Sequence, residues 1–112
     1  MLFKKYHIEW IRTGKKVVTR RLWKRWHAKV GGRYPAQDSF CKPRIECPII
    51  ECTARYMQPL SEMTEEDANK EGGYTLAGFQ ETFRAITGKW DPTLVPYVVE
   101  FKYVGEGAEI YG

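Results

Sequence analysis

The chain has 112 residues, a length that predicts a single domain, and 43% of them are hydrophobic, which is enough for one core. No stretch is apolar and long enough to cross a bilayer, and the N-terminal residues lack the features of a secretory signal. We therefore expect a cytoplasmic protein with no membrane partner. Its three cysteines, at positions 41, 47 and 52, fit neither a disulfide framework nor a metal-binding pair, so we predict no metal and no cofactor.

The net charge of +4 is unevenly distributed along the chain. Residues 1–33 hold eleven of the 18 basic residues and one acid, so they carry +10, whereas residues 34–112 carry −6. This asymmetry favours a polyanionic partner, and nucleic acid before a membrane. The alternative is a solvated basic face that the acidic half balances in the folded molecule.

The first third of the chain predicts a helix followed by short strands. Apolar residues recur at steps of three and four over residues 3–13, which predicts a helix, and β-branched residues predict a strand over 16–22. Residues 23–28 fit either a turn of helix or a loop. A strand is expected over residues 34–39, and Pro35 favours its place at a sheet edge.

The centre of the chain gives the clearest strand pattern. Alternation of apolar residues over 44–57 predicts a strand, and the buried parity changes at Ile49 and Ile50, which predicts a bulge or bend there. Thr64, followed by three acids, is typical of a helix N-terminus, and this helix should end by Glu71.

The last third predicts one more helix and a closing strand. Thr75 should cap a helix that Gly88 ends, with a core stripe of Leu76, Phe79, Phe83 and Ile86. Residues 95–104 predict the closing strand. The order of elements indicates an α+β fold, for which we expect a closed or nearly closed barrel with helices at its ends and a loose tail over residues 105–112.

The segment from Gly14 to Arg21 carries the most chemistry. It places Lys16 three residues before Thr19, beside fixed positive charge. A lysine and a hydroxyl in this setting can serve as base and nucleophile, and they can equally bind a phosphate. The sequence leaves both interpretations open.

Several motifs resemble the ASCH domain, a family within the PUA-like superfamily. The pattern Gly14-x-Lys16-x-x-Thr19-x-Arg21 is similar to the family signature, and the turn at residues 30–33, the acidic helix at 60–72 and the strand at 97–101 follow in the family's order. The resemblance covers about residues 5–104. It implies a PUA-like mixed β pseudobarrel with flanking short helices, formed as a single domain over residues 1–104.

The resemblance also implies a cleft for RNA or a nucleobase derivative. A short bacterial branch of the family removes the acetyl group from acetylcytidine, and its active-site positions are matched here by Lys16, Thr19 and Glu71. The chain departs from that branch by one extra residue after Glu71 and by the tryptophan- and arginine-rich segment 23–28. These departures concern the identity of the substrate more than the existence of a site.

The enzyme interpretation sets conditions on these three residues. Lys16 can deprotonate Thr19 only if burial and neighbouring cations lower its pKa, and Glu71 can protonate the leaving amine only if burial raises its pKa. Residues three apart face opposite sides of a regular strand, so Lys16 and Thr19 can converge only if the backbone between them is irregular. We predict such irregularity after Gly14.

The binding interpretation uses the basic and aromatic residues that follow. Cations contact phosphates and aromatic faces stack on bases in single-stranded RNA recognition. The candidate residues are Arg20, Arg21, Trp23, Lys24, Arg25, Trp26 and Lys29. The alternative is that the tryptophans pack into the protein and the arginines are solvated. Our leading hypothesis is a monomeric module that binds RNA or a modified nucleoside, with an acetylcytidine amidohydrolase as the alternative.

Overall fold

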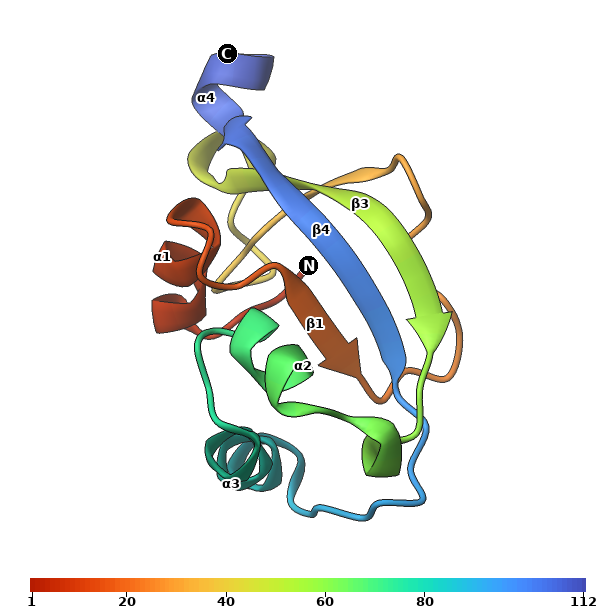
Figure 1. The fold of residues 1–112 in the computed structure, drawn as a ribbon. Helices are drawn as coiled ribbons and strands as arrows, with labels where there is room; N and C mark the ends of the chain where they lie inside the picture. Colours follow the sequence, from red (N-terminus) through yellow and green to blue (C-terminus); the bar gives the residue numbers. More distant parts are fainter.

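A four-stranded antiparallel sheet organises the chain, whose computed structural model describes residues 1–112 (Figure 1). Its order is β1-β4-β3-β2, and every neighbouring pair is antiparallel. The strands are β1 (Val18–Arg21), β2 (Arg33–Pro35), β3 (Pro48–Met57) and β4 (Tyr97–Glu106). The two long strands, β3 and β4, therefore form the centre of the sheet, and the short strands form its edges.

Short helices flank this sheet, as the α+β class requires. They are α1 (Lys5–Arg12), α2 (Glu65–Lys70), α3 (Leu76–Thr87) and α4 (Gly107–Tyr111), with 3₁₀ turns η1 (Arg44–Glu46) and η2 (Leu60–Glu62). Figure 1 shows α2 and α3 near the end of the sheet where β4 begins, and α4 at the end where β4 stops. None of the helices has the length and apolar character needed to span a bilayer.

The sheet is not closed, so of the closed or nearly closed barrel that the sequence predicted, the closed alternative is excluded. The edge strands β1 and β2 pair only with β4 and β3, and not with each other. Four strands, two of them three or four residues long, are too few to close a cylinder around a packed interior. The sheet is therefore a curved half-barrel, and its one parallel pairing is an isolated bridge between Leu2 and Gln37.

The bend predicted in the central strand is present. The pairing of β3 with β4 shifts between Ile49 and Ile50 and again between Cys52 and Ala54, so the buried face changes as the strand proceeds. The strand begins at Pro48 rather than at residue 44, because residues 44–46 form η1. Pro35 lies in the edge strand β2, where its missing N–H breaks no ladder.

Local capping signals place the helix ends where the sequence predicted them. Thr64 and Asp67 form a reciprocal capping box at the start of α2, and Thr75 accepts a hydrogen bond from the Gly78 N–H at the start of α3. Gly88 ends α3 with a φ of 93°, a left-handed conformation that favours glycine. Residues 23–28, which the sequence left between helix and loop, form a loop.

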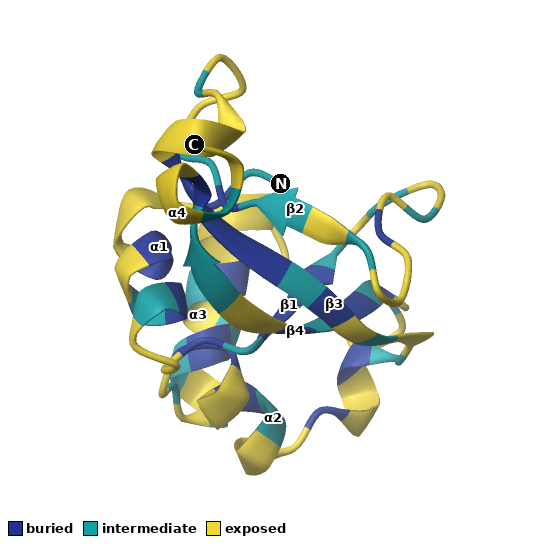
Figure 2. Ribbon diagram, turned by 90° about the horizontal axis from the view of Figure 1, so that it is seen from above, coloured by how far each residue is buried: buried dark blue, intermediate teal, exposed yellow.

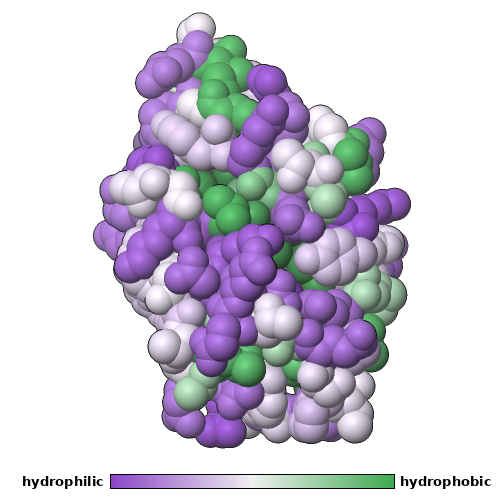
Figure 3. Space-filling view, viewed as in Figure 1, coloured by the Kyte–Doolittle hydropathy of each residue, from purple (hydrophilic) through white to green (hydrophobic).

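The core lies between the sheet and the helices. Ile49, Ile50, Val98 and Val99 are each at most 1% exposed. Figure 2 shows much of β3 in the dark blue of buried residues. Hydrophilic side chains cover most of the face seen in Figure 3, with hydrophobic ones exposed in small patches. Ile86 is 50% exposed and lies outside the cluster of Phe79 and Phe83, which corrects its prediction as part of the core stripe.

The C-terminal residues differ from the loose tail that the sequence predicted. Strand β4 continues to Glu106, and residues 107–111 form α4. The N–H of Gly107 donates to the carbonyl of Cys47 at 2.7 Å, and Gly107 itself is buried. The segment is held because glycine is the one residue that fits this close approach of backbones.

Substitution of Gly107 tests how far the fold depends on this contact. The methyl group added in Gly107→Ala would overlap the carbonyl oxygen of Arg44, so we expect the free energy of unfolding to fall by about 2 kcal/mol in urea titrations. Ala108→Ser, at the exposed neighbouring position, should change it by less than about 0.5 kcal/mol. Equal effects of the two changes would show that the segment after β4 contributes nothing to stability.

Candidate functional site

The main pocket has a volume of about 580 Å³ and lies between the N-terminal segment, β1 and α3. Its polar side is formed by residues of the segment 16–21 and by Glu71, at the end of α2. Its apolar side includes Phe79, Phe83 and Ile86 from α3. The pocket therefore brings together Lys16, Thr19 and Glu71, the three residues that the ASCH resemblance implied.

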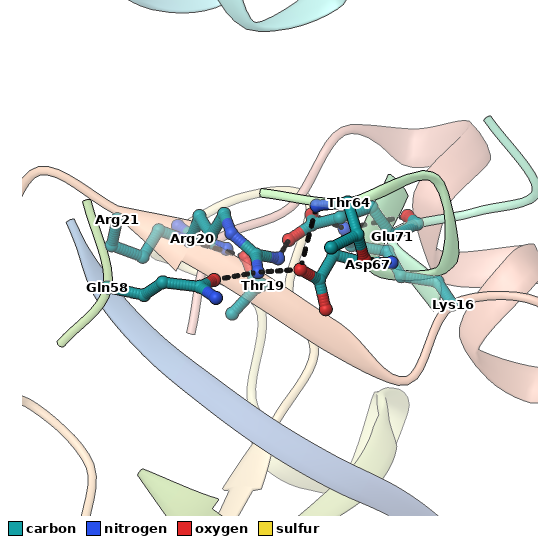
Figure 4. Close-up of polar contacts among 8 residues, drawn as sticks. All are labelled: Lys16, Thr19, Arg20, Arg21, Gln58, Thr64, Asp67 and Glu71. Carbon is teal, nitrogen blue, oxygen red and sulfur yellow. Dashed lines mark hydrogen bonds and ion pairs between the residues drawn. The ribbon is translucent and has the colours of Figure 1, made fainter. Parts of the chain in front are cut away.

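Glu71 is held between two cations at the base of the pocket (Figure 4). Lys16 Nζ donates to Glu71 Oε1 and to the Glu71 carbonyl oxygen, both at 2.9 Å, and Arg20 Nη1 donates to Glu71 Oε2 at 2.8 Å. All three residues are buried: Lys16 is 3% exposed, Arg20 6% and Glu71 2%. Each carboxylate oxygen of Glu71 therefore accepts a hydrogen bond from a buried cation.

Arg20 faces the protein interior and not the solvent. Besides Glu71, its guanidinium donates to Gln58 Oε1 at 2.7 Å and lies 3.8 Å from Asp67 Oδ2, while its Nε has no hydrogen-bond partner. Its side chain is about 1% exposed. Arg20 thus joins β1 to α2, and oxygens of Glu71 and Gln58 engage both of its terminal nitrogens, although the residue lines the pocket.

The backbone before β1 is irregular, as the convergence of Lys16 and Thr19 requires. Gly14 has a φ of 78°, and the N–H groups of Lys15 and Lys16 both donate to the carbonyl of Trp10. Val17 N–H then donates to the carbonyl of Lys70, which ties this segment to α2. Regular strand geometry begins only at residue 18, so the prediction of a break after Gly14 is confirmed.

The two glycines after Glu71, a departure from the acetylcytidine branch, have a structural role here. A Cβ atom at Gly72 would lie 2.5 Å from the Trp10 ring, and one at Gly73 would lie 2.8 Å from Lys15 Cε. Both glycines also have positive φ values, 150° and 79°. They allow the chain after α2 to approach α1 closely, and this approach positions Glu71 beneath Lys16.

Thr19 is linked to Arg21 and not to Lys16. Thr19 Oγ1 accepts a hydrogen bond from Arg21 Nε at 2.9 Å, while Arg21 Nη2 donates to the Leu2 carbonyl at 2.6 Å. Arg21 Cζ lies 4.7 Å from the centre of the Phe3 ring. Lys16 and Thr19 share the pocket, yet no hydrogen bond joins them, so this structure does not contain a formed base–nucleophile pair.

Burial and positive charge shape the titration of groups around the pocket. Burial lowers the pKa of Lys16, an effect that Glu71 opposes and that Arg21 and Arg20 reinforce. The pKa of His7 falls to about 4, first because of burial and then because of Lys16, Arg21 and Lys4. His7 Nε2 lies 3.1 Å from the hydroxyl of Tyr74, and both residues line the pocket.

The tryptophan- and arginine-rich segment lies elsewhere on the molecule. Trp23 and Trp26 pack against Tyr97, with ring centres 6.2 Å and 4.6 Å apart, and both are partly buried. Lys24, Arg25 and Lys29 are exposed. None of these residues lines the main pocket, so the candidate binding residues fall into two separate places.

Sequence reasoning missed several residues of the pocket. His7 and Tyr74 belong to no sequence motif described above, and Lys4 and Lys5 contribute there only to the net charge of residues 1–33. They come from segments up to 70 residues apart in the chain, and no spacing in the sequence links them to Thr19. Their shared place is a consequence of the way α1 and the loop before α3 meet over β1.

Solved structures with the same fold identify the class of domain. No protein-family model matches the chain, and no curated protein matches it in sequence. The crystal structure of an ASCH domain from Lactobacillus crispatus JV V101 superposes with a TM-score of 0.77 at 20% identity, covering 95% of this chain and 77% of that one. The crystal structure of a protein of Enterococcus faecalis V583 from the family DUF984 superposes with a TM-score of 0.65 at 19% identity. The match covers 94% of this chain and 71% of that one. The chain therefore has the ASCH-domain fold, as its motifs predicted.

Replacement of Glu71 tests the buried ion pairs. In Glu71→Gln both Lys16 and Arg20 remain buried without a carboxylate between them, so we expect the free energy of unfolding to fall by about 3 kcal/mol or more. The control Glu66→Gln removes a carboxylate whose side chain is 80% exposed beside Lys70, and it should cost less than about 1 kcal/mol. Urea unfolding of both variants measures the difference, and similar losses would contradict a structural role for the Glu71 pairs.

The lowered pKa of His7 makes stability depend on pH. Between the unfolded value of 6.5 and the folded value of about 4, the unfolded chain binds more protons than the folded protein. Stability from His7 is therefore present above pH 6.5 and is lost as the pH falls. We expect the free energy of unfolding to drop by about 2 kcal/mol more between pH 7 and pH 5 in the native protein than in His7→Gln. Equal pH slopes would refute this assignment.

Proposed function

We propose that the main pocket binds a single nucleoside or modified base, either free or within RNA. The observation that carries this proposal is the pocket itself, which sets the aromatic side chains of α3 against a polar base formed by Thr19, Arg21 and Glu71. Its volume of about 580 Å³ lies in the range of small-molecule sites. A nucleobase has the matching character, since its faces are apolar and its edges carry hydrogen-bond donors and acceptors.

The neighbouring chemistry supports recognition of polar groups on such a ligand. The Thr19 hydroxyl accepts one hydrogen bond from Arg21 and keeps its own proton to donate. Phe79 and Tyr74 offer aromatic surface on the other side of the pocket. A ligand seated between them stacks on the rings and directs its polar edge toward β1.

An acetylcytidine amidohydrolase is the second candidate, and the burial of Lys16 favours it. Because burial lowers the pKa of this amine, it loses its proton more readily than an exposed lysine and can accept the proton of Thr19. Thr19 Oγ1 would attack the acetyl carbon, the C–N bond would break as the amine of cytidine takes a proton, and water would then hydrolyse the threonine ester. Lys16 must leave Glu71 to reach Thr19, so ligand binding has to rearrange the ion pairs.

The exposed basic residues of segment 23–29 support a contact with an RNA strand. Lys24, Arg25 and Lys29 carry no ion pair and are exposed. Trp23 and Trp26 are engaged with Tyr97, so they offer only part of their surface to a base. We therefore assign phosphate contacts to the cations of this segment and base recognition to the main pocket.

One experiment separates binding from hydrolysis. The protein is titrated with cytidine and acetylcytidine by calorimetry, and cytidine release from acetylcytidine is followed by chromatography. If the pocket is catalytic, Thr19→Val and Lys16→Met should slow release by about 100-fold, because each change removes a reacting group. Thr53→Val, at an exposed position of β3, is the matched control and should leave the rate unchanged.

The outcomes assign the function. Binding without release, lost in Thr19→Val, supports the binding module and eliminates the hydrolase. Release that Thr19→Val and Lys16→Met do not alter eliminates the three-residue catalytic site. If the protein binds neither compound, the proposed function is wrong.

A further inference from the structure

The main pocket contains more positive charge than its carboxylates neutralise. Two acids line it, Glu71 and Asp38. Glu71 is engaged by Lys16 and Arg20, and Asp38 lies 3.7 Å from the Lys42 ammonium. The remaining cations of the lining are Lys4, Lys5 and Arg21, and none of them forms an ion pair.

Arg21 is the most informative of these three cations. It is partly buried, and its two hydrogen bonds go to neutral acceptors, the Thr19 hydroxyl and the Leu2 carbonyl. Its third nitrogen, Nη1, donates to no group of the protein. The contact with the Phe3 ring holds the guanidinium in place. The Arg21 guanidinium is thus partly shielded from water and has no carboxylate partner, so an anion in the pocket can form a charge-assisted hydrogen bond with Nη1.

The lysines beside Arg21 extend the same positive region to the solvent. Lys4 and Lys5 are exposed residues at the start of α1, and both line the pocket. Lys4 and Arg21 also contribute to lowering the pKa of His7, which shows that their charges act together on the interior of the pocket. An anionic group placed here would meet one oriented guanidinium and two mobile ammonium groups, a set of donors suited to phosphate.

We infer that the ligand of this pocket carries a phosphate, so that it is a nucleotide rather than a neutral nucleoside, and that Arg21, Lys4 and Lys5 hold this phosphate. The inference rests on the proposed function for the base, and it adds the charged part of the ligand. A free nucleoside monophosphate and a nucleotide within RNA share this chemistry. A comparison of ligands with one and with several nucleotides distinguishes the free monophosphate from RNA.

Calorimetry with four ligands tests the inference: cytidine, cytidine 5′-monophosphate, a cytidine trinucleotide and inorganic phosphate. We expect the monophosphate to bind at least about tenfold more tightly than cytidine, since charge-assisted hydrogen bonds contribute this much. The advantage should shrink with added salt. The affinity advantage of the monophosphate should fall below about threefold in the double variant Lys4→Gln/Lys5→Gln and in Arg21→Gln. Lys4 and Lys5 are exposed, so their replacement should not disturb folding.

A charge-matched control keeps the result specific. Lys70→Gln/Lys102→Gln removes the same charge from α2 and β4, outside the lining of the pocket, and should preserve the advantage of the monophosphate. Tighter binding of the trinucleotide than of the monophosphate identifies an RNA strand as the source of the phosphate, and equal binding identifies the free nucleotide.

The two proposals fail in different ways. Equal affinity for cytidine and its monophosphate overturns the phosphate inference and leaves the nucleoside pocket intact. Binding of inorganic phosphate that Arg21→Gln abolishes, without binding of cytidine or of its monophosphate, supports the phosphate contact of Arg21 but refutes both the proposed function and the identification of the ligand as a nucleotide. The inference is also overturned if the Lys70/Lys102 control loses as much of the monophosphate's affinity advantage as the Lys4/Lys5 variant does. Equal losses would show an effect of net charge alone.

Discussion

The buried contact of Glu71 with Lys16 and Arg20 is the interaction on which the site depends. It joins the irregular segment before β1 to the end of α2, two parts of the chain more than 50 residues apart. Burying three charges is expensive, and the attraction between them offsets the cost only when the geometry satisfies both carboxylate oxygens. Here it does, with bonds of 2.8 and 2.9 Å.

This contact also divides the polar residues of the segment 16–21 into two groups. Lys16 and Arg20 are engaged by Glu71, whereas Arg21 donates to Thr19 and to the Leu2 carbonyl. The first group stabilises the fold around the pocket, and the second is available to a ligand. The two candidate roles of this segment, catalysis and phosphate binding, therefore depend on different atoms. Catalysis needs Lys16 to exchange partners, while phosphate binding uses an Arg21 nitrogen that is already free.

The parts of the fold that depend on neighbouring residues were predictable from the sequence. Capping by Thr64 and Thr75 and the change of parity at Ile49 each arise within a few residues, and the structure has all three. The inward direction of Arg20 was not predictable, because it follows from where α2 meets β1. Adjacent arginines look equivalent in a sequence, but in a strand they alternate, and each meets what the fold has placed on its side. The gathering of Lys4, His7 and Tyr74 around Thr19 has the same non-local origin.

The separation of the main pocket from segment 23–29 constrains how RNA can bind. Trp26 lies at the Tyr97 end of β4, and Lys24, Arg25 and Lys29 project from the same loop into solvent. The pocket is lined by the N-terminal segment, β1 and α3, and by none of these loop residues. In the proposed function a single nucleotide therefore occupies the pocket without contacting the loop, whereas an RNA strand can reach both places. Arg21, the last residue of β1, and the exposed Leu22 both line the pocket and directly precede the loop in the chain, so they connect the two places where we propose that RNA is contacted.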